Sequence, residues 1–248
     1  MEYPEFNGKT AIATGAASGM ALLFLQKMAE QGANVVLTDV NEDAVQAAAG
    51  EIRRKGGSAV GVKVDVRKYE EIQNAADIAM EKFGRIDYLM NSAGGCSQRV
   101  CKQSGGFVNA SPESIEWGVD VNLKGAVLFV RAVLGRMFEQ NYGVIINMGS
   151  IDGVSGGACL DYTASKCGMI GLSQGIANYG AEHGVRSVCI SPGPVLTRVL
   201  DCPMIHARSV PALITLYSFF SRTSSGFSVC GSYSAVFSAT FPGDSATT

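Results

Sequence analysis

The sequence lacks a marked excess of charge of either sign. Its 20 Lys and Arg residues stand against 22 Asp and Glu residues, which gives a formal net charge of −2. A nucleic-acid-binding domain carries a basic surface that attracts phosphates, and the composition supplies no basic excess for one. We therefore expect no nucleic-acid partner. A hydrophobic fraction of 47% also excludes a disordered chain, and 248 residues are enough for one α/β domain.

Metal-binding and disulfide patterns are absent as well. The chain has only two histidines, and its seven cysteines include no C-x-x-C pair. An odd number of unpaired cysteines supports neither a disulfide framework nor a zinc site. The sequence therefore predicts free thiols, no metal and a reducing, cytoplasmic location.

Long apolar runs are also missing. Residues 1–7 are acidic and lack the apolar core of a secretion signal, and the longest apolar run, near residues 210–220, is too short to span a bilayer. We expect no membrane association. Glycine, by contrast, is in excess. It supplies 30 of the 248 residues, a share well above the usual value of about 7%. So much glycine predicts many tight turns or close approaches of the backbone.

Short apolar segments alternate with amphipathic segments about a dozen residues long, a pattern typical of βαβ units. Strands are predicted at residues 10–14, 34–39, 59–64, 86–91, 144–148 and 185–190, and helices at 19–31, 41–55, 69–83, 119–140 and 162–182. This order predicts a single domain with a Rossmann-like, doubly wound parallel sheet and helices on both faces. Ligands of such folds bind beyond the carboxyl ends of the strands. A polar loop at residues 94–112 follows the fourth strand, where such a ligand would lie.

A glycine-rich turn, T-G-A-A-S-G-M-A at residues 14–21, connects the first strand to the first helix. Such turns let the backbone approach a pyrophosphate, which the N-terminus of the helix then stabilises. Asp39 ends the second strand, 24 residues after Gly15, where a carboxylate can accept hydrogen bonds from a ribose diol. The alternative for Asp39 is an N-cap of the next helix. The Asp39 carboxylate would repel the 2′-phosphate of NADP(H), and no Lys or Arg beside Asp39 or in the glycine-rich turn offsets that repulsion. We therefore expect NAD(H) rather than NADP(H).

The motif Tyr162-Thr163-Ala164-Ser165-Lys166 opens a predicted helix. Residues four apart share a helix face, so the phenol and the ammonium can point into one pocket. A nearby cation favours the phenolate, so Lys166 together with an oxidised nicotinamide would bring the Tyr162 pKa down from about 10 towards neutrality and allow proton exchange with an alcohol. As an isolated pattern, Y-x-x-x-K is also common on surface helices.

Together with its order along the chain, this set of motifs resembles the short-chain dehydrogenase/reductase family over residues 8–197. The resemblance implies an oxidoreductase that moves a hydride between NAD and a secondary alcohol or ketone, and a homodimer or homotetramer. It implies cofactor contacts from the glycine turn, the ends of later strands and the segment after residue 191. These are Gly15, Ser18, Gly19, Met20, Asp39, Asp65, Val66, Asn91, Ala93, Gly94, Tyr162, Lys166, Pro192, Gly193, Val195 and Thr197.

The same resemblance implies four catalytic residues, Asn122, Ser150, Tyr162 and Lys166. Ser150 and Tyr162 would hold the substrate oxygen, and Tyr162 would take or give its proton as the hydride moves. Lys166 would hold the nicotinamide ribose and lower the Tyr162 pKa, and the backbone of Asn122 would hold a water linked to the lysine. The sequence departs from the family's pattern where Ser92 replaces an Asn and Ala21 replaces a third glycine.

Several other side chains have two interpretations. Arg99 and Lys102 are candidates for recognising an acidic or phosphorylated substrate, although a solvated loop tip explains them more simply. Cys96, Cys101 and Cys159 have no visible partner base and are interpreted as small pocket-lining side chains. Trp117 is interpreted as core or subunit interface. His183 and His206 receive no role.

The C-terminal segment differs in composition from the rest. No lysine follows Lys166, no glutamate follows Glu182, and residues 202–248 hold ten serines. We therefore divide the chain into a catalytic domain at residues 1–198 and an atypical segment at 199–248. That segment is either a trimmed substrate lid, with residues 226–237 as the last strand, or a stretch foreign to the fold. The second possibility keeps an alternative function open, an NAD-binding sensor or scaffold without turnover. Epimerase or dehydratase chemistry fits the short chain less well.

Overall fold

The computed structural model describes residues 3–193 and 195, and the backbone of residues 212–219 and 231–237. These residues form one sheet in the order β3-β2-β1-β4-β5-β6-β7-β8. The strands are β1 (Thr10–Thr14), β2 (Asn34–Asp39), β3 (Ser58–Lys63), β4 (Tyr88–Asn91), β5 (Gly143–Met148), β6 (Val185–Pro192), β7 (Ala212–Phe219) and β8 (Gly231–Phe237). All neighbouring pairs from β3 to β6 are parallel, which confirms the predicted Rossmann-like, doubly wound sheet. The order reverses between β1 and β4, where such folds bind ligands.

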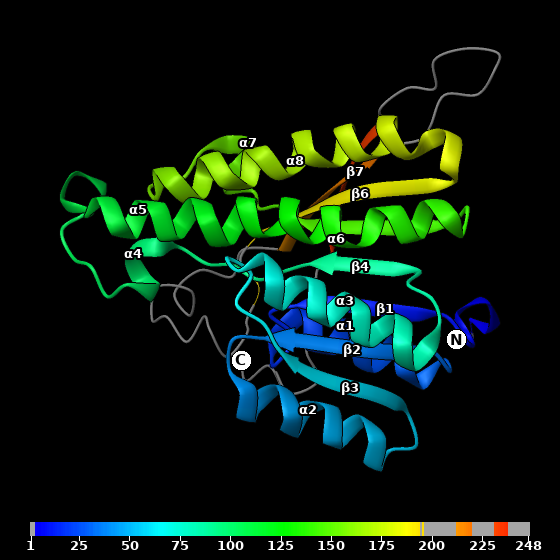
Figure 1. Cartoon of the computed structure of the whole chain (residues 1–248). Helices are drawn as coiled ribbons and strands as arrows, with labels where there is room; N and C mark the ends of the chain where they lie inside the picture. Colours follow the sequence, from blue (N-terminus) through cyan, green and yellow to red (C-terminus); the bar gives the residue numbers. More distant parts are fainter. Residues whose placement is uncertain (1–2, 194, 196–211, 220–230, 238–248) are drawn as a thin grey trace, which may run out of the picture.

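Helices cover both faces of the sheet. One layer holds α1 (Gly19–Glu30) and α2 (Glu42–Arg54), and the other holds α3 (Tyr69–Phe83), α6 (Gly125–Glu139) and α8 (Leu160–Gly180), as Figure 1 shows. Shorter elements are η1 (Pro4–Phe6), α4 (Ser97–Val100), η2 (Phe107–Asn109), α5 (Pro112–Val119), η3 (Asp120–Lys124), α7 (Asp152–Ser155) and η4 (Ala181–His183). In Figure 1, α4 and α5 lie beyond the end of the sheet towards which β2, β3 and β4 point.

The two layers follow from side-chain alternation along the strands, which sends successive residues to opposite faces. On β1, Ile12 packs with the α3, α6 and α8 layer, whereas Ala11 and Ala13 pack with α1 and α2. On β2, Val36 joins the first cluster, whereas its neighbours join the second. Both faces of these central strands are therefore buried, which explains their continuous apolar sequences.

The loop predicted at residues 94–112 is partly helical, because it contains α4 and η2. The helix predicted to start at residue 119 is preceded directly by α5, which starts at Pro112. Ser111 is its N-cap and accepts a hydrogen bond from the Ser114 amide at 3.3 Å, and proline suits the first helical position. Between α5 and α6 the chain forms a single π-helical turn, η3. Such turns are often found at functional sites.

The C-terminal segment adds two strands that continue the sheet. β7 pairs antiparallel with β6, and β8 pairs antiparallel with β7. The strand anticipated at residues 226–237 therefore exists at Gly231–Phe237, and residues 226–230 lie outside the described residues. In the described part of the chain, no helix combines the length and the apolar character needed to cross a membrane.

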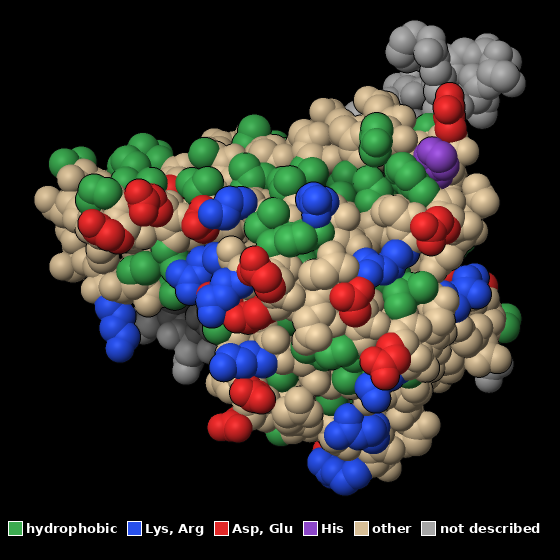
Figure 2. All heavy atoms as spheres, viewed as in Figure 1, with side chains coloured by type: hydrophobic (Ala, Val, Ile, Leu, Met, Phe, Trp, Pro, Cys, Tyr) green, Lys and Arg blue, Asp and Glu red, His purple; other side chains and the backbone are tan. Residues whose placement is uncertain are grey.

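Charge is dispersed over the face formed by α3, α6 and α8. Figure 2 shows acidic and basic side chains interspersed there, without a continuous basic patch. This distribution agrees with the formal net charge of −2.

A hydrogen-bonded junction joins the ends of β1 and β4. The Thr14 hydroxyl oxygen accepts hydrogen bonds from the amides of Ser92 and Ala93, both at 2.9 Å. Thr14 is 3% exposed, so water cannot readily replace it as an acceptor. One side chain thus fixes where the chain leaves β4.

We expect a Thr14→Val change to lower the free energy of unfolding by about 2 kcal/mol, because it leaves two amides without their acceptor. Thr14→Ser keeps the oxygen and removes only a methyl group, so its cost should be about 1 kcal/mol or less. Urea denaturation of the three proteins measures both values. Equal losses for the two variants would contradict a role for the hydroxyl.

Candidate active site

A cavity of about 840 Å³ opens at the carboxyl ends of the parallel strands. Its volume lies in the range usual for cofactor and small-molecule sites. Most of the residues predicted for the site line it, namely Gly15, Ser18, Gly19, Met20, Asp39, Asp65, Val66, Ala93, Gly94, Ser150, Tyr162, Lys166, Pro192, Gly193 and Val195. Asn91 and Asn122 are buried outside this lining, and Thr197 lies outside the described residues.

The glycine-rich turn fits a bound pyrophosphate. Gly15 has φ +65°, and a Cβ there would lie 3.0 Å from the Ala93 Cα, so only glycine suits this position. Ser18 is the N-cap of α1 and makes no side-chain capping bond. Its hydroxyl and the free amides of the first turn therefore border the cavity with unused donors, which is the chemistry that anions require.

Asp39 does not cap the following helix. The N-cap of α2 is Asn41, whose side-chain oxygen accepts a hydrogen bond from the Ala44 amide at 3.0 Å. The Asp39 carboxylate instead accepts from the Ala17 amide at 3.1 Å and the Asn41 amide at 3.0 Å. It ties the glycine turn to the end of β2 while bordering the cavity.

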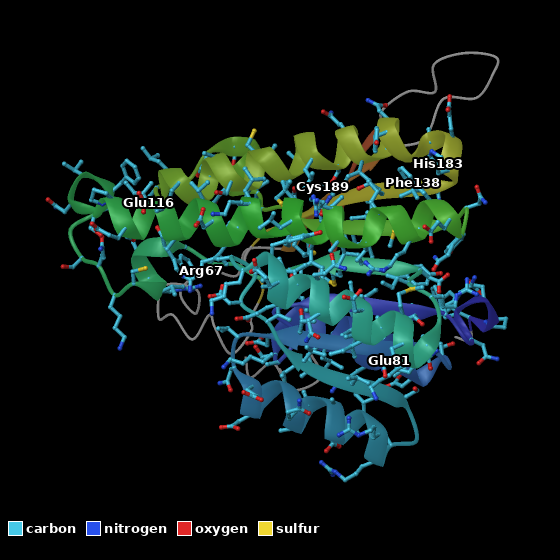
Figure 3. All side chains as sticks on the ribbon, in the orientation of Figure 1. Arg67, Glu81, Glu116, Phe138, His183 and Cys189 are labelled. Atoms are coloured by element: carbon cyan, nitrogen blue, oxygen red, sulfur yellow. The ribbon has the colours of Figure 1, made fainter. Side chains whose placement is uncertain are left out.

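A second carboxylate, Asp65, forms a forked ion pair with Arg67. The guanidinium Nη2 lies 2.6 Å from Asp65 Oδ2, and its Nε lies 2.9 Å from Oδ1. This hydrogen bonding holds the Asp65 pKa below its ordinary value. Figure 3 shows Arg67 near α4, at the carboxyl ends of the strands. Although Arg67 lines the cavity, its charge is already paired.

Ser150 and Tyr162 meet at the other end of the cavity. Ser150 follows β5 and is 8% exposed, and its hydroxyl accepts a hydrogen bond from the Asp152 amide at 3.2 Å. Burial raises the Tyr162 pKa above its ordinary value, a hydrogen bond with Ser150 opposes this, and the Asp152 charge adds to it. Among the protein's own groups, desolvation therefore outweighs the favourable contacts, and the lowering of the Tyr162 pKa predicted from Lys166 together with an oxidised nicotinamide stays a prediction for the cofactor-bound site.

Lys166 is fully enclosed beneath the tyrosine. Its Nζ donates a hydrogen bond to the Met148 carbonyl at 2.8 Å and lies 5.5 Å from the centre of the Tyr162 ring. Burial lowers its pKa from 10.5 to about 8. At neutral pH the lysine is still mostly protonated, so a positive charge lies in the wall of the cavity, close to Tyr162.

Asn122, in the π-helical turn η3, supports the segment after β4. Its Oδ1 accepts a hydrogen bond from the Gly95 amide at 2.9 Å, and its Nδ2 donates to the Gly95 and Gly118 carbonyls at 2.9 and 2.8 Å. Gly94 has φ +153°, and a Cβ there would collide with Asn122 Oδ1. A side chain at position 94 would therefore displace Asn122 from its hydrogen bonds with Gly95.

Asn91 belongs to a buried polar network rather than to the cavity wall. Its Nδ2 donates to Asn147 Oδ1 at 2.9 Å, and Asn147 Nδ2 donates to the Ser173 hydroxyl at 2.8 Å. This network joins β4, β5 and α8. Asn147, Ser173 and Thr14 were not among the residues predicted for the site. The only signal for Asn147 was a single polar residue in an otherwise apolar strand, and Thr14 is one of two threonines that flank the apolar residues of β1.

The cavity lining also includes Cys96, Arg99, Trp117 and Cys159. The prediction that Cys96 and Cys159 line a pocket agrees with this placement, whereas Cys101 and Lys102 are not in the lining. Trp117 was interpreted as core or subunit interface, and the structure places it in the cavity wall. It lies one turn before η3 on α5, so the register of that helix directs it to the site.

Comparison with known proteins gives the family. A model described as short chain dehydrogenase matches residues 9–202. This chain belongs to the short-chain dehydrogenase family. It is therefore an oxidoreductase-family protein whose fold implies a nicotinamide cofactor and a small-molecule substrate.

Individual relatives of this short-chain dehydrogenase are similar over most of its length. "Oxidoreductase UcpA" of Salmonella typhimurium is 35% identical over 199 residues, which cover 79% of this chain and 73% of the relative. An "Uncharacterized oxidoreductase SSP0419" of Staphylococcus saprophyticus is 37% identical and covers 78% of this chain and 81% of its own. Among solved structures, NAD+-bound xylitol dehydrogenase is 32% identical with a TM-score of 0.70, covering 76% of this chain and 71% of its own.

We expect the unfolding free energy of this short-chain dehydrogenase to increase with pH relative to that of a Lys166→Met variant. The folded-state pKa of Lys166 is about 8 and its ordinary value is 10.5. Unfolding therefore takes up a proton between these pH values and becomes less favourable as pH increases. From pH 7 to pH 10, the difference in unfolding free energy should move by about 2 kcal/mol in favour of the wild type.

Urea denaturation at the two pH values measures this shift. Lys82→Met removes an exposed lysine from the end of α3 and serves as the control, for which the difference should stay constant. If the difference in unfolding free energy between the wild type and Lys166→Met were the same at both pH values, no buried ammonium would be present.

Proposed function

We propose that this protein is an NAD(H)-dependent oxidoreductase that interconverts a secondary alcohol and a ketone, with Tyr162 as the general acid and base. One observation carries the proposal. A single cavity brings Ser150, Tyr162 and Lys166 together at one end and the Gly15 turn and Asp39 at the other. A protein that only bound the dinucleotide would need the second set and not the first.

The proposed steps use this chain's own groups. The hydroxyls of Ser150 and Tyr162 hold the substrate oxygen, and Tyr162 Oη takes its proton in the oxidative direction or gives one in the reductive direction. The Lys166 ammonium stabilises negative charge that develops on the phenol oxygen. Asn122 acts indirectly by holding Gly95 and with it the cavity wall. When bound, the nicotinamide cofactor supplies hydride transfer.

The preference for NAD(H) rests on charge at the adenosine end. The Asp39 carboxylate borders the cavity beside Val40, and the nearby Arg67 is paired with Asp65. A 2′-phosphate would meet an anion without a free cation beside it, which costs free energy.

Other parts of the proposal follow from the family. A homodimer or homotetramer and a cytoplasmic location both remain predictions. So does the division into a catalytic unit at residues 1–198 and a distinct segment at 199–248. In support of that division, the family match ends at residue 202.

We expect Tyr162→Phe to lower kcat by at least about 100-fold while NADH affinity changes less than about threefold, because only the proton-transfer group is removed. Steady-state assays over a panel of secondary alcohols and ketones, followed by NADH absorbance, measure turnover. Fluorescence titration with NADH measures binding. Retained turnover in the variant would refute the role of Tyr162, and NADH binding by a wild type inactive on the whole panel would favour a sensor.

We expect Asp39→Asn to reduce the preference for NAD over NADP by about tenfold or more, mainly through a lower KM for NADP, because a charge repulsion is removed. The amide keeps an oxygen that can accept from the Ala17 or Asn41 amide. Glu42→Gln is the matched control, since it removes a nearby carboxylate outside the cavity lining. Kinetics with both cofactors decide the question, and a wild type that prefers NADP would refute the assignment.

A further inference from the structure

Two cysteines meet at the wall of the cavity, although they are 63 positions apart in the sequence. The Sγ atoms of Cys96 and Cys159 lie 2.8 Å apart, and both cysteines are free thiols. Cys96 is the N-cap of α4, directly after Gly94 and Gly95. Cys159 is the N-cap of α8, three residues before Tyr162. A thiol pair therefore joins the segment after β4 to the helix that carries Tyr162 and Lys166.

The two thiols differ in access. Both cysteines line the cavity, but Cys96 is partly exposed, whereas Cys159 is only 8% exposed. A small oxidant that enters the cavity therefore reaches Cys96 first. Burial, with a contribution from Cys96, raises the pKa of Cys159 to about 11. Because the thiolate is the nucleophile, Cys159 needs a base to react near neutral pH.

Asp161 lies next to the Cys159 thiol. The Cys159 thiol donates a hydrogen bond to Asp161 Oδ1 at 3.4 Å, and its sulfur also lies 3.7 Å from the Ser97 hydroxyl. The Asp161 side chain is 4% exposed, and its Oδ2 has no hydrogen-bond partner among the described residues. A buried carboxylate with an unused acceptor oxygen, which is unusual in a folded protein, therefore lies in contact with the buried thiol.

We propose that Cys96 and Cys159 form an oxidisable dithiol site at the cavity wall, with Asp161 as the proton acceptor for Cys159. With a small disulfide such as oxidised glutathione, the Cys96 thiolate attacks one sulfur, forms a mixed disulfide and releases one glutathione thiolate. Cys159 then passes its proton to Asp161 and attacks the Cys96 sulfur, which releases the second glutathione. The two protein thiols lose two electrons and two protons, and oxidised glutathione becomes two molecules of reduced glutathione.

The disulfide changes the site in two ways. It links the cavity wall after Gly95 covalently to the first turn of α8. It also removes an ionisable thiol beside Tyr162, where a Cys96 thiolate raises the Tyr162 pKa. The site thus couples the redox state of the thiols to the position and the proton affinity of the tyrosine. Formation of the bond itself does not depend on the proposed dehydrogenase activity.

Three other described cysteines lack this arrangement. Cys101 is outside the cavity lining, and Cys167 is exposed on α8. Cys189 is fully buried on β6, as labelled in Figure 3, and burial raises its pKa. Cys101 and Cys167 therefore provide matched cysteine-to-serine controls.

The test is to treat the full-length protein with oxidised glutathione at pH 7.5, block remaining thiols by alkylation and identify linked peptides by mass spectrometry. We expect one Cys96–Cys159 disulfide that dithiothreitol reverses. Cys101→Ser and Cys167→Ser should form it as readily as the wild type. Cys159→Ser should stop at a mixed disulfide on Cys96, and Cys96→Ser should leave Cys159 unmodified.

Asp161→Asn tests the base. We expect it to slow closure of the mixed disulfide at least about tenfold at pH 7.5 and to regain much of the rate at pH 9.5, where hydroxide replaces the carboxylate as base. Closure at the wild-type rate would refute the role of Asp161. A wild type in which Cys96 stays a mixed disulfide, or pairs with another cysteine, would overturn the dithiol site, whatever the enzymatic activity.

Discussion

The close approach of β1 and β4 at their carboxyl ends is the constraint on which the site depends. The backbone after β1 passes so near Ala93 that Gly15 has no room for a side chain. Thr14 holds both strands at that separation through two hydrogen bonds. Because the sheet order reverses between these strands, the crossover helices depart in opposite directions and leave a crevice. The glycine turn and the Gly94 segment border this crevice from its two sides.

The same junction places the groups at the other end of the cavity. Asn122 fixes Gly95 from the π-helical turn, and Asn91, Asn147 and Ser173 tie β4 and β5 to α8. Since α8 carries Tyr162 and Lys166 on its first two turns, a shift of β5 relative to α8 would move both side chains. The polar network therefore acts through position, although its members do not line the cavity.

The six parallel strands were predictable because each is a short apolar run between helical patterns, a local signal. The meeting of Tyr162 with Lys166 was equally predictable, since it depends only on helix periodicity. Thr14, Asn147 and the Cys96–Cys159 pair were not, because their partners are distant in sequence and only the folded chain brings them together. The run at residues 210–220 was weighed only as a membrane span, yet β7 lies within it. Its strand character depends on pairing with β6, which local sequence does not reveal.

Burial decides the direction in which the protein's own groups shift the pKa values of Tyr162 and Lys166. A lysine four residues from a tyrosine suggests a lowered phenol pKa, but Lys166 is buried and Tyr162 is only partly exposed. Burial disfavours the charged form of each group, so the Tyr162 pKa rises and the Lys166 pKa falls. The protein's own groups thus keep the proton on Tyr162 at neutral pH. Any lowering needed for proton abstraction must come from charge that enters the cavity with its ligands, which makes proton transfer conditional on occupancy.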